Sequence, residues 1–219
     1  MEDRVAPDLR QFFALIDRCV SIDLEVDPLR ARILSFAAVT PDPNKKLVFK
    51  DGNLARAISE LSAFAEPAEF LLGHNINFFD LPHLETAGLS PRTIVKPVID
   101  TLWLNPLAFP RNPYHHLVKH YQDGRLEGSH VNDPEMDARL VLAVLESQIR
   151  ALSNLNTTNP DMLVAYHWLT TSGPHGKGFE AIFSLVRGRS PTRIHANWLL
   201  KEIIQLGLAV PPSILLRAE

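Results

Sequence analysis

The sequence has little cysteine and no long apolar run. Its one cysteine, Cys19, excludes an internal disulfide framework and a zinc site built from several cysteines. No N-terminal segment has the pattern of a secretory signal peptide, and no apolar stretch of 18 residues could span a membrane. We therefore expect a cytoplasmic protein with no membrane partner. With 46% hydrophobic residues among 219, the chain can form one sizeable core.

The sequence also lacks a nucleotide-binding loop and a strong excess of one charge. Segment 172–179, SGPHGKGF, does not have the spacing of the G-x-x-x-x-G-K-[ST] motif, which excludes ATP binding there. The net charge is −3, but residues 151–219 carry six basic and four acidic residues while the rest of the chain is acidic. A basic part beside an acidic one can still bind a polyanion, especially if cations offset the acids.

The pattern of apolar residues predicts an α/β fold with a mixed, five-stranded sheet flanked by helices. Predicted strands cover residues 19–26, 32–39, 46–50, 69–75 and 94–104. Predicted helices cover residues 8–18, 52–65, 78–87, 114–121 and 134–150. A polar linker is predicted at 153–160, followed by helices at 161–171, 179–187 and 195–207. We therefore expect two domains, residues 1–152 and a small helical extension at 153–219.

The predicted strand 19–26 carries two acids on one face. Because side chains alternate along a strand, Asp23 and Glu25 share a face and lie ~7 Å apart. Its other face is apolar: Val20, Ile22, Leu24 and Val26. In isolation this pattern is typical of a half-buried strand with a solvated face. The alternative is that the two carboxylates hold a cation together.

Two further acids lie near predicted helix starts. Asp80 follows the buried strand 69–75, so it either begins the next helix or lies among functional groups at the carboxyl end of that strand. Asp133 precedes Pro134, and this pair predicts a helix start with a structural cap.

Asp137 is the most unusual acid in the sequence. It shares the apolar side of the predicted helix 134–150, since Val141 and Leu145 follow it by four and eight residues. A carboxylate in that position is costly unless it is paired or metal-bound. Four acids converging on one sheet face suit a pair of Mg2+ or Mn2+ ions, which prefer oxygen ligands and support phosphodiester hydrolysis.

Three segments together resemble the exonuclease motifs of DnaQ-like 3′–5′ exonucleases, the DEDDh type of the DEDD superfamily. These segments are SIDLEVDPLRARILSFAAV, LLGHNINFFDLPHL and NDPEMDARLVLAVL, which match in order and spacing within residues 18–150. The resemblance implies an RNase H-like fold. It also implies that two Mg2+ or Mn2+ ions are bound by Asp23, Glu25, Asp80 and Asp137, and that nucleotides are removed from a 3′ end.

Segment 98–121, VIDTLWLNPLAFPRNPYHHLVKHY, is similar to exonuclease-like modules that some bacterial chains join to RecQ-like helicases. The resemblance therefore implies a helicase or another DNA-processing protein as partner. The helical extension would guide substrate or dock that partner. Alternatively, the basic residues of the extension form an ordinary solvated face: Lys177, Arg187, Arg189, Arg193 and Lys201.

The sequence departs from the family pattern at its general base. The family has a histidine five residues before its last aspartate, where this chain has Asn132, and His130 lies two residues upstream. The tyrosine branch of the superfamily is excluded, because Asp133 stands where its tyrosine would be. Imidazole accepts a proton from water near neutral pH, and an amide does not. Either His130 is the base, or Asn132 only orients the attacking water, or the module is inactive and only binds nucleic acid.

Substrate contacts are assigned to Leu24, His74, Asn75 and Asn132, with hydrogen bonding at a strand end as the equal alternative for His74 and Asn75.

The first hypothesis is a metal-dependent 3′–5′ exonuclease on DNA that favours single-stranded 3′ ends, with RNA also open as substrate. The second is a catalytically weak or inactive nucleic-acid-binding module of a larger helicase or defence assembly.

Overall fold

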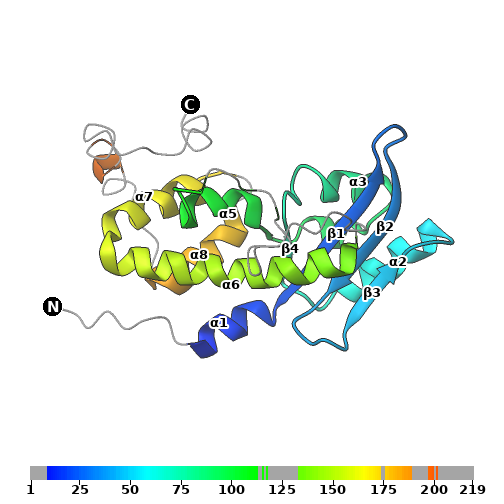
Figure 1. Ribbon diagram of the computed structural model, residues 1–219, viewed down its shortest axis with the longest axis horizontal. Coiled ribbons are helices and arrows are strands. Elements are labelled where there is room, and N and C mark those ends of the chain that lie inside the picture. Colours follow the sequence, from blue (N-terminus) through cyan, green and yellow to red (C-terminus); the bar gives the residue numbers. More distant parts are fainter. Residues whose placement is uncertain are drawn as a thin grey trace, which may run out of the picture. The chain divides into compact units, whose positions relative to one another are not determined.

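The structure, a computed structural model, is an α/β fold built on one five-stranded sheet (Figure 1). It describes residues 9–112, 115, 117, 133–173, 176–188, 197–199 and 201. The strands are β1 (Cys19–Asp27), β2 (Arg32–Val39), β3 (Lys46–Phe49), β4 (Phe70–Gly73) and β5 (Val98–Asp100). The helices are α1 (Leu9–Ile16), α2 (Leu54–Ala65), α3 (Asp80–Thr86), α4 (Pro91–Ile94), α5 (Thr101–Ala108), α6 (Pro134–Thr158), α7 (Pro160–Thr171) and α8 (Gly176–Arg187).

The sheet is mixed, as the sequence predicts. Its order is β3-β2-β1-β4-β5, with β1 antiparallel to β2 and β2 antiparallel to β3. The pairs β1–β4 and β4–β5 are parallel. Three strands joined by short turns are followed by two parallel strands reached through helices, which is an RNase H-like arrangement.

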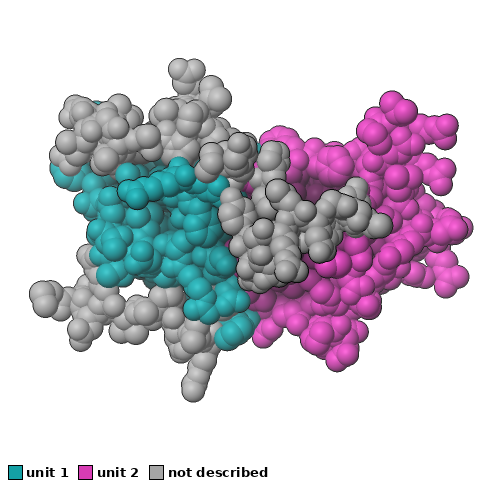
Figure 2. All heavy atoms as spheres, viewed as in Figure 1, with its two compact units in different colours: residues 1–15, 103–113, 146–219 teal, residues 16–102, 114–145 magenta. Residues whose placement is uncertain are grey.

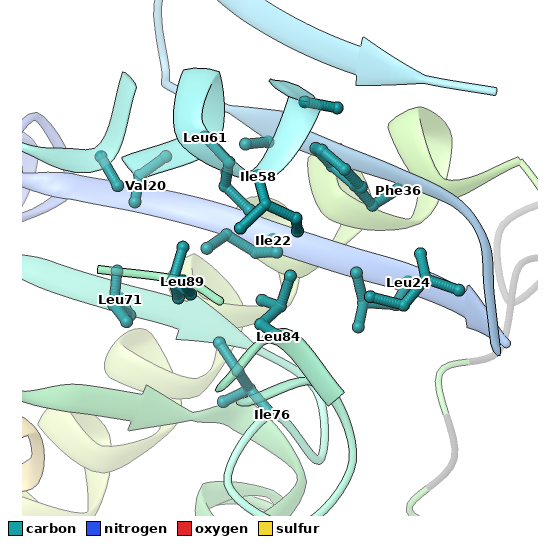
Figure 3. Packing of buried hydrophobic residues seen from close by; sticks show 14 residues of the cluster. Val20, Ile22, Leu24, Phe36, Ile58, Leu61, Leu71, Ile76, Leu84 and Leu89 are labelled. Atoms are coloured by element: carbon teal, nitrogen blue, oxygen red, sulfur yellow. The ribbon is translucent and has the colours of Figure 1, made fainter. Parts of the chain in front are cut away.

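One face of the sheet forms the main hydrophobic core. Val20, Ile22 and Leu24 alternate along β1 onto this face, where α2 covers them. Figure 3 shows Ile58 and Leu61 of α2 beside Ile22. The alternation leaves the acids of β1 on the opposite face, so burial of this apolar row determines where the carboxylates lie.

The predicted strand 94–104 is wrong over most of its length. Within this range Ile94 is the last residue of α4, only Val98–Asp100 forms a strand, and α5 begins at Thr101. Pro97 has no N–H for a sheet, although its carbonyl accepts from Leu71 N at 3.0 Å. The apolar run after Asp100 suits a buried helix as well as a strand, and periodicity alone does not separate the two.

The predicted linker 153–160 is also wrong, because α6 continues to Thr158. Its polar side chains are satisfied within the helix: the hydroxyls of Ser153 and Thr158 each donate to the carbonyl four residues earlier. Asn156 Nδ2 donates to the carbonyl of Val186 in α8 at 3.0 Å. The break falls at Asn159, whose side chain caps α7.

The chain forms two compact units, coloured separately in Figure 2. Unit 2, residues 16–102 and 114–145, contains the whole sheet and the first part of α6. Unit 1, residues 1–15, 103–113 and 146–219, contains the rest of α6 together with α7 and α8. The predicted domain division at residue 152 stays a prediction. The predicted helices 114–121 and 195–207 lie largely outside the described residues.

No helix among the described residues is both long and apolar enough to cross a membrane. Where α7 and α8 pack together in unit 1, Leu163 and Phe183 are fully buried, and so is His167, whose Nε2 lies 2.9 Å from Glu180 Oε2.

Candidate metal centre

Three carboxylates meet in unit 2, on the face of β1 opposite the main core. Asp23 and Glu25 come from β1 and Asp137 comes from α6, and one oxygen of each lies within 4.8 Å of the others. They are the only group of three metal-ligating side chains found among the described residues. The structure thus brings together side chains that are more than a hundred residues apart in the chain.

The spacing of these oxygens fits a small divalent cation. In octahedral coordination at ~2.1 Å, neighbouring oxygens lie ~3 Å apart and opposite oxygens ~4 Å apart. All three donors are carboxylate oxygens, the hard ligands that Mg2+ and Mn2+ prefer. Three negative charges so close together also repel each other, and a cation between them would remove that repulsion.

Asp137 is held in place by the start of α6. Asp133 caps the helix by accepting from Glu135 N at 3.1 Å, and Pro134 occupies the first helical position. This confirms the structural role predicted for Asp133. Asp137 is only 7% exposed and lies on the same buried side of α6 as Val141 and Leu145, as its spacing predicts.

Ion pairs fasten the same helical turn to the sheet. Lys46 Nζ at the start of β3 donates to both oxygens of Glu135 at 2.9 and 3.0 Å. Arg139 Nε donates to Glu135 Oε1 at 3.1 Å, and Arg139 Nη2 donates to the carbonyl of Pro43. These contacts lie two residues on either side of Asp137 and hold this turn of α6 to β3 and the turn before it.

The partner strand leaves room for the acids. In the antiparallel register Asp23 lies opposite Ala37 and Glu25 lies opposite Ser35. Both partners are small, so β2 places no bulky side chain beside the carboxylates. After Glu25 the register shifts by a bulge, and bulges of this kind commonly re-aim side chains next to functional sites.

Asp80 is adjacent to the three carboxylates, but one of its oxygens is engaged in a backbone hydrogen bond. It is the first residue of α3, and its Oδ1 accepts from Leu24 N, between Asp23 and Glu25, at 3.0 Å. Asp80 is therefore a first-turn acid and not the cap, which is Phe79. Burial, at 2% exposure, raises the pKa of Asp80 to about 8, and the negative charges of Asp100 and Glu25 add to the shift.

The loop that delivers Asp80 is fastened by Asp100 at the end of β5. Asp100 is fully buried and accepts from Asn75 N at 2.9 Å and from Asn77 N at 3.2 Å. Asn77 Nδ2 and Leu102 N donate to the same carboxylate. Desolvation by burial raises the pKa of Asp100, and these donors oppose the shift. Asp100 therefore has a structural role, since it holds the loop between β4 and α3.

A close backbone approach at Gly73 makes this loop possible. A Cβ at Gly73 would lie 2.6 Å from Ile76 Cβ, so only glycine fits. Asn75 has φ +70°, a left-handed conformation that asparagine tolerates better than most residues.

The His74 side chain makes a strand-end hydrogen bond, one of the two roles predicted for it. Thr101 Oγ1 donates to the carbonyl of Gly73 at 3.0 Å. That hydroxyl therefore accepts from His74 Nδ1, 2.9 Å away, which places a ring proton on Nδ1. A substrate contact by His74 or Asn75 stays a prediction.

Of the other predicted site residues, His130 and Asn132 lie outside the described residues. The Leu24 side chain is buried in the hydrophobic core, while its backbone N–H binds Asp80. Its role as a substrate contact therefore stays a prediction too.

Sequence reasoning missed the supporting residues Lys46, Glu135, Asn77 and Thr101. Only Glu135 had a visible signal, since an acid in the second position after an aspartate cap lies in the first helical turn. The other three act across 23 to 89 residues of chain, and no local pattern encodes such contacts.

Comparison of the chain with protein-family models, with curated proteins and with solved structures gave no match. The chemical character of the site therefore comes from its own residues: three clustered carboxylates, a fourth buried acid beside them, and charged contacts that hold the helix in place.

Proposed function

We propose that this chain is a metal-dependent 3′–5′ exonuclease that hydrolyses phosphodiester bonds at 3′ ends of DNA, single-stranded ends preferred. The convergence of Asp23, Glu25 and Asp137 within 4.8 Å on one sheet face is the observation that carries the proposal. The three-segment resemblance to DnaQ-like exonucleases supports the same chemistry, and an RNase H-like sheet suits it.

Asp23, Glu25 and Asp137 would bind the cations, with the second oxygen of Asp80 completing the set. Two Mg2+ or Mn2+ ions, when bound, would lower the pKa of a water and offset charge on the leaving oxygen. The protein's own part is to hold the carboxylates in position. Asp80 also links α3 to β1, because its Oδ1 accepts a hydrogen bond from Leu24 N.

General-base help is assigned to His130, with Asn132 as the residue that orients the water if His130 does not reach it. Such help is typically worth ~10²–10⁴-fold in rate. A site without it would still turn over slowly, so the presence of Asn132 at the family's histidine position does not remove the proposed activity.

The second candidate is a nucleic-acid-binding module with weak or no catalysis, favoured by Asn132 at that position. The buried position of Asp137 favours the enzyme, because burying a carboxylate is costly and a bound cation would lower that cost. The two candidates differ in one measurable property, cleavage by the pure protein.

The test is a nuclease assay with Mn2+ or Mg2+ on 3′-blocked and 5′-blocked single-stranded DNA and RNA. Wild-type protein should produce a ladder from free 3′ ends only, and Asp137→Asn should abolish it. Asp161→Asn is the matched control, because Asp161 is an exposed acid in the first turn of α7. His130→Ala then reports on the base. Binding without any cleavage would establish the second candidate instead.

A further inference from the structure

The hairpin that joins β1 to β2 carries exposed side chains that the proposed metal centre does not use. The hairpin tip, residues 28–34, presents Leu29 at 93% exposure and Leu34 at 48%. Arg30 and Arg32 are exposed beside them. In Figure 1 the loop between β1 and β2 projects away from α3.

Two hydrogen bonds of Asp27 close the turn in which Leu29 is exposed. Asp27 Oδ1 accepts from Leu29 N at 2.9 Å, and Arg30 N donates to the carbonyl of Asp27 at 3.3 Å. Ala31 has φ +50°, a left-handed conformation that a residue with a Cβ seldom adopts. Burial of this exposed leucine side chain against a partner would be favourable, because it removes apolar surface from water.

The strand register connects the tip with the metal centre. Asp23 lies opposite Ala37, and after the bulge Asp27 lies opposite Arg32. Because faces alternate, Arg32 is on the same sheet face as the acids, about two residues or ~7 Å beyond Glu25 along β1. A single strand whose end lies at the carboxylates and that runs along β1 towards the hairpin would pass Arg32 next.

The charges at the tip fit a polyanion. Neither Arg30 nor Arg32 forms an ion pair with any residue of the described part of the chain. Arginine binds phosphate oxygens through a planar set of donors. An exposed apolar side chain near two such arginines matches a single strand, which offers phosphates on its backbone and the faces of unstacked bases.

We propose that the hairpin tip is the binding surface for the nucleotides that precede the 3′ end of a single-stranded substrate. Arg30 and Arg32 contact the phosphates on the 5′ side of the scissile bond, and Leu29 packs against a base. This inference rests on the proposed function for the direction of the strand. Its contacts are to backbone and base faces, so it recognises single strands without sequence preference.

The experiment measures binding apart from cleavage. Fluorescence polarisation of a labelled 12-nucleotide oligothymidylate is followed in the Asp137→Asn background between 50 and 200 mM salt. Arg30→Gln/Arg32→Gln should weaken binding about tenfold or more at low salt. It should also lower the salt slope by about 1.4, at ~0.7 per phosphate contact. Leu29→Ser should weaken binding about fivefold, as expected for the loss of one leucine side chain that is partly buried against a base in the complex.

The control removes the same charge elsewhere in unit 2. Arg56→Gln/Arg92→Gln changes two exposed cations on α2 and α4 and should alter affinity less than twofold. The tip variant, made in the otherwise wild-type chain, should keep the Mn2+-induced rise in melting temperature, which shows that the acids are intact.

Equal oligonucleotide affinity of the tip variant and the control variant overturns the inference, as does an absence of any oligonucleotide binding. A change of oligomeric state in Leu29→Ser with unchanged affinity assigns the tip to contacts between copies of the chain and also overturns it. Arginine-dependent binding by a wild-type protein that cleaves nothing supports the tip and refutes the exonuclease, so the two failures are distinguishable.

Discussion

Replacement of Asp80 by asparagine should make the metal-free protein more stable. The Asp80 carboxyl is 2% exposed, and burial raises its pKa from 3.8 to about 8. In the unfolded chain the group is ionised at pH 7, whereas the folded state favours its protonated form. Each pH unit between 3.8 and 7 therefore costs the folded state ~1.36 kcal/mol, up to about 4 kcal/mol in total.

Asparagine removes this penalty and keeps an oxygen that accepts from Leu24 N. Its amide also introduces donors, and an unsatisfied donor costs about 1–3 kcal/mol. The net expectation is a stabilisation of roughly 1–3 kcal/mol at pH 7. Because a raised carboxyl pKa contributes stability at low pH that is lost as pH rises towards about 8, the advantage of Asp80→Asn should vanish near pH 4.

The assay is thermal and urea unfolding with EDTA at pH 4, 6 and 8. Asp17→Asn, at an exposed turn position, is the matched control and should show no comparable gain. Adding Mn2+ should reverse the order, because wild-type protein gains more from the cation than Asp80→Asn does. A variant that is less stable than wild type at pH 8, or a difference that does not vary with pH, would refute the reasoning.

Three further outcomes are expected. Lys46→Met releases Glu135 and should weaken Mn2+ binding by up to about fivefold by titration, since a half-exposed ion pair is worth at most about 1 kcal/mol, while the exposed Lys45→Met should not. Gly73→Ala meets Ile76 and should lower the free energy of unfolding by about 1–3 kcal/mol in urea, whereas Gly173→Ala, with open space around it, should be neutral. Burial lowers the pKa of His167 below 6.5, so the folded state resists its protonation and stability should fall as the pH drops below 6.5. His167→Gln should lose that dependence in melting experiments across pH 5 to 8, and an unchanged profile would contradict the assignment.

The fold could be predicted to the extent that local periodicity encodes it. The strand of Cys19–Asp27 and the acid at Asp137 follow from alternation and from helical spacing, because one face of each element is buried. The break at Asp100–Thr101 could not be predicted in this way. Residues 102–104 after it are all apolar, and such a short run gives strand and helix the same pattern.

The acidic residues of the candidate site could be predicted from the sequence, but the contacts that hold them in place could not. Asp137 interrupts the apolar side of its helix, while Asp23 and Glu25 share one face of a strand whose other face is apolar. These positions make the three acids visible in the sequence. The contact of Lys46 with Glu135 joins exposed charged residues 89 positions apart, and each alone is an ordinary surface residue. The hydrogen bond that Asp80 accepts from Leu24 N likewise depends on tertiary packing.

The most direct test of a metal centre that serves nucleic-acid hydrolysis is cleavage of a 5′-labelled single-stranded DNA by the pure protein, with and without Mn2+. We predict stepwise shortening from the 3′ end that requires Mn2+, stops at a blocked 3′ terminus and disappears in Asp137→Asn but not in Asp161→Asn. Intact substrate under all conditions, from a protein whose melting temperature does not respond to Mn2+, would contradict the account.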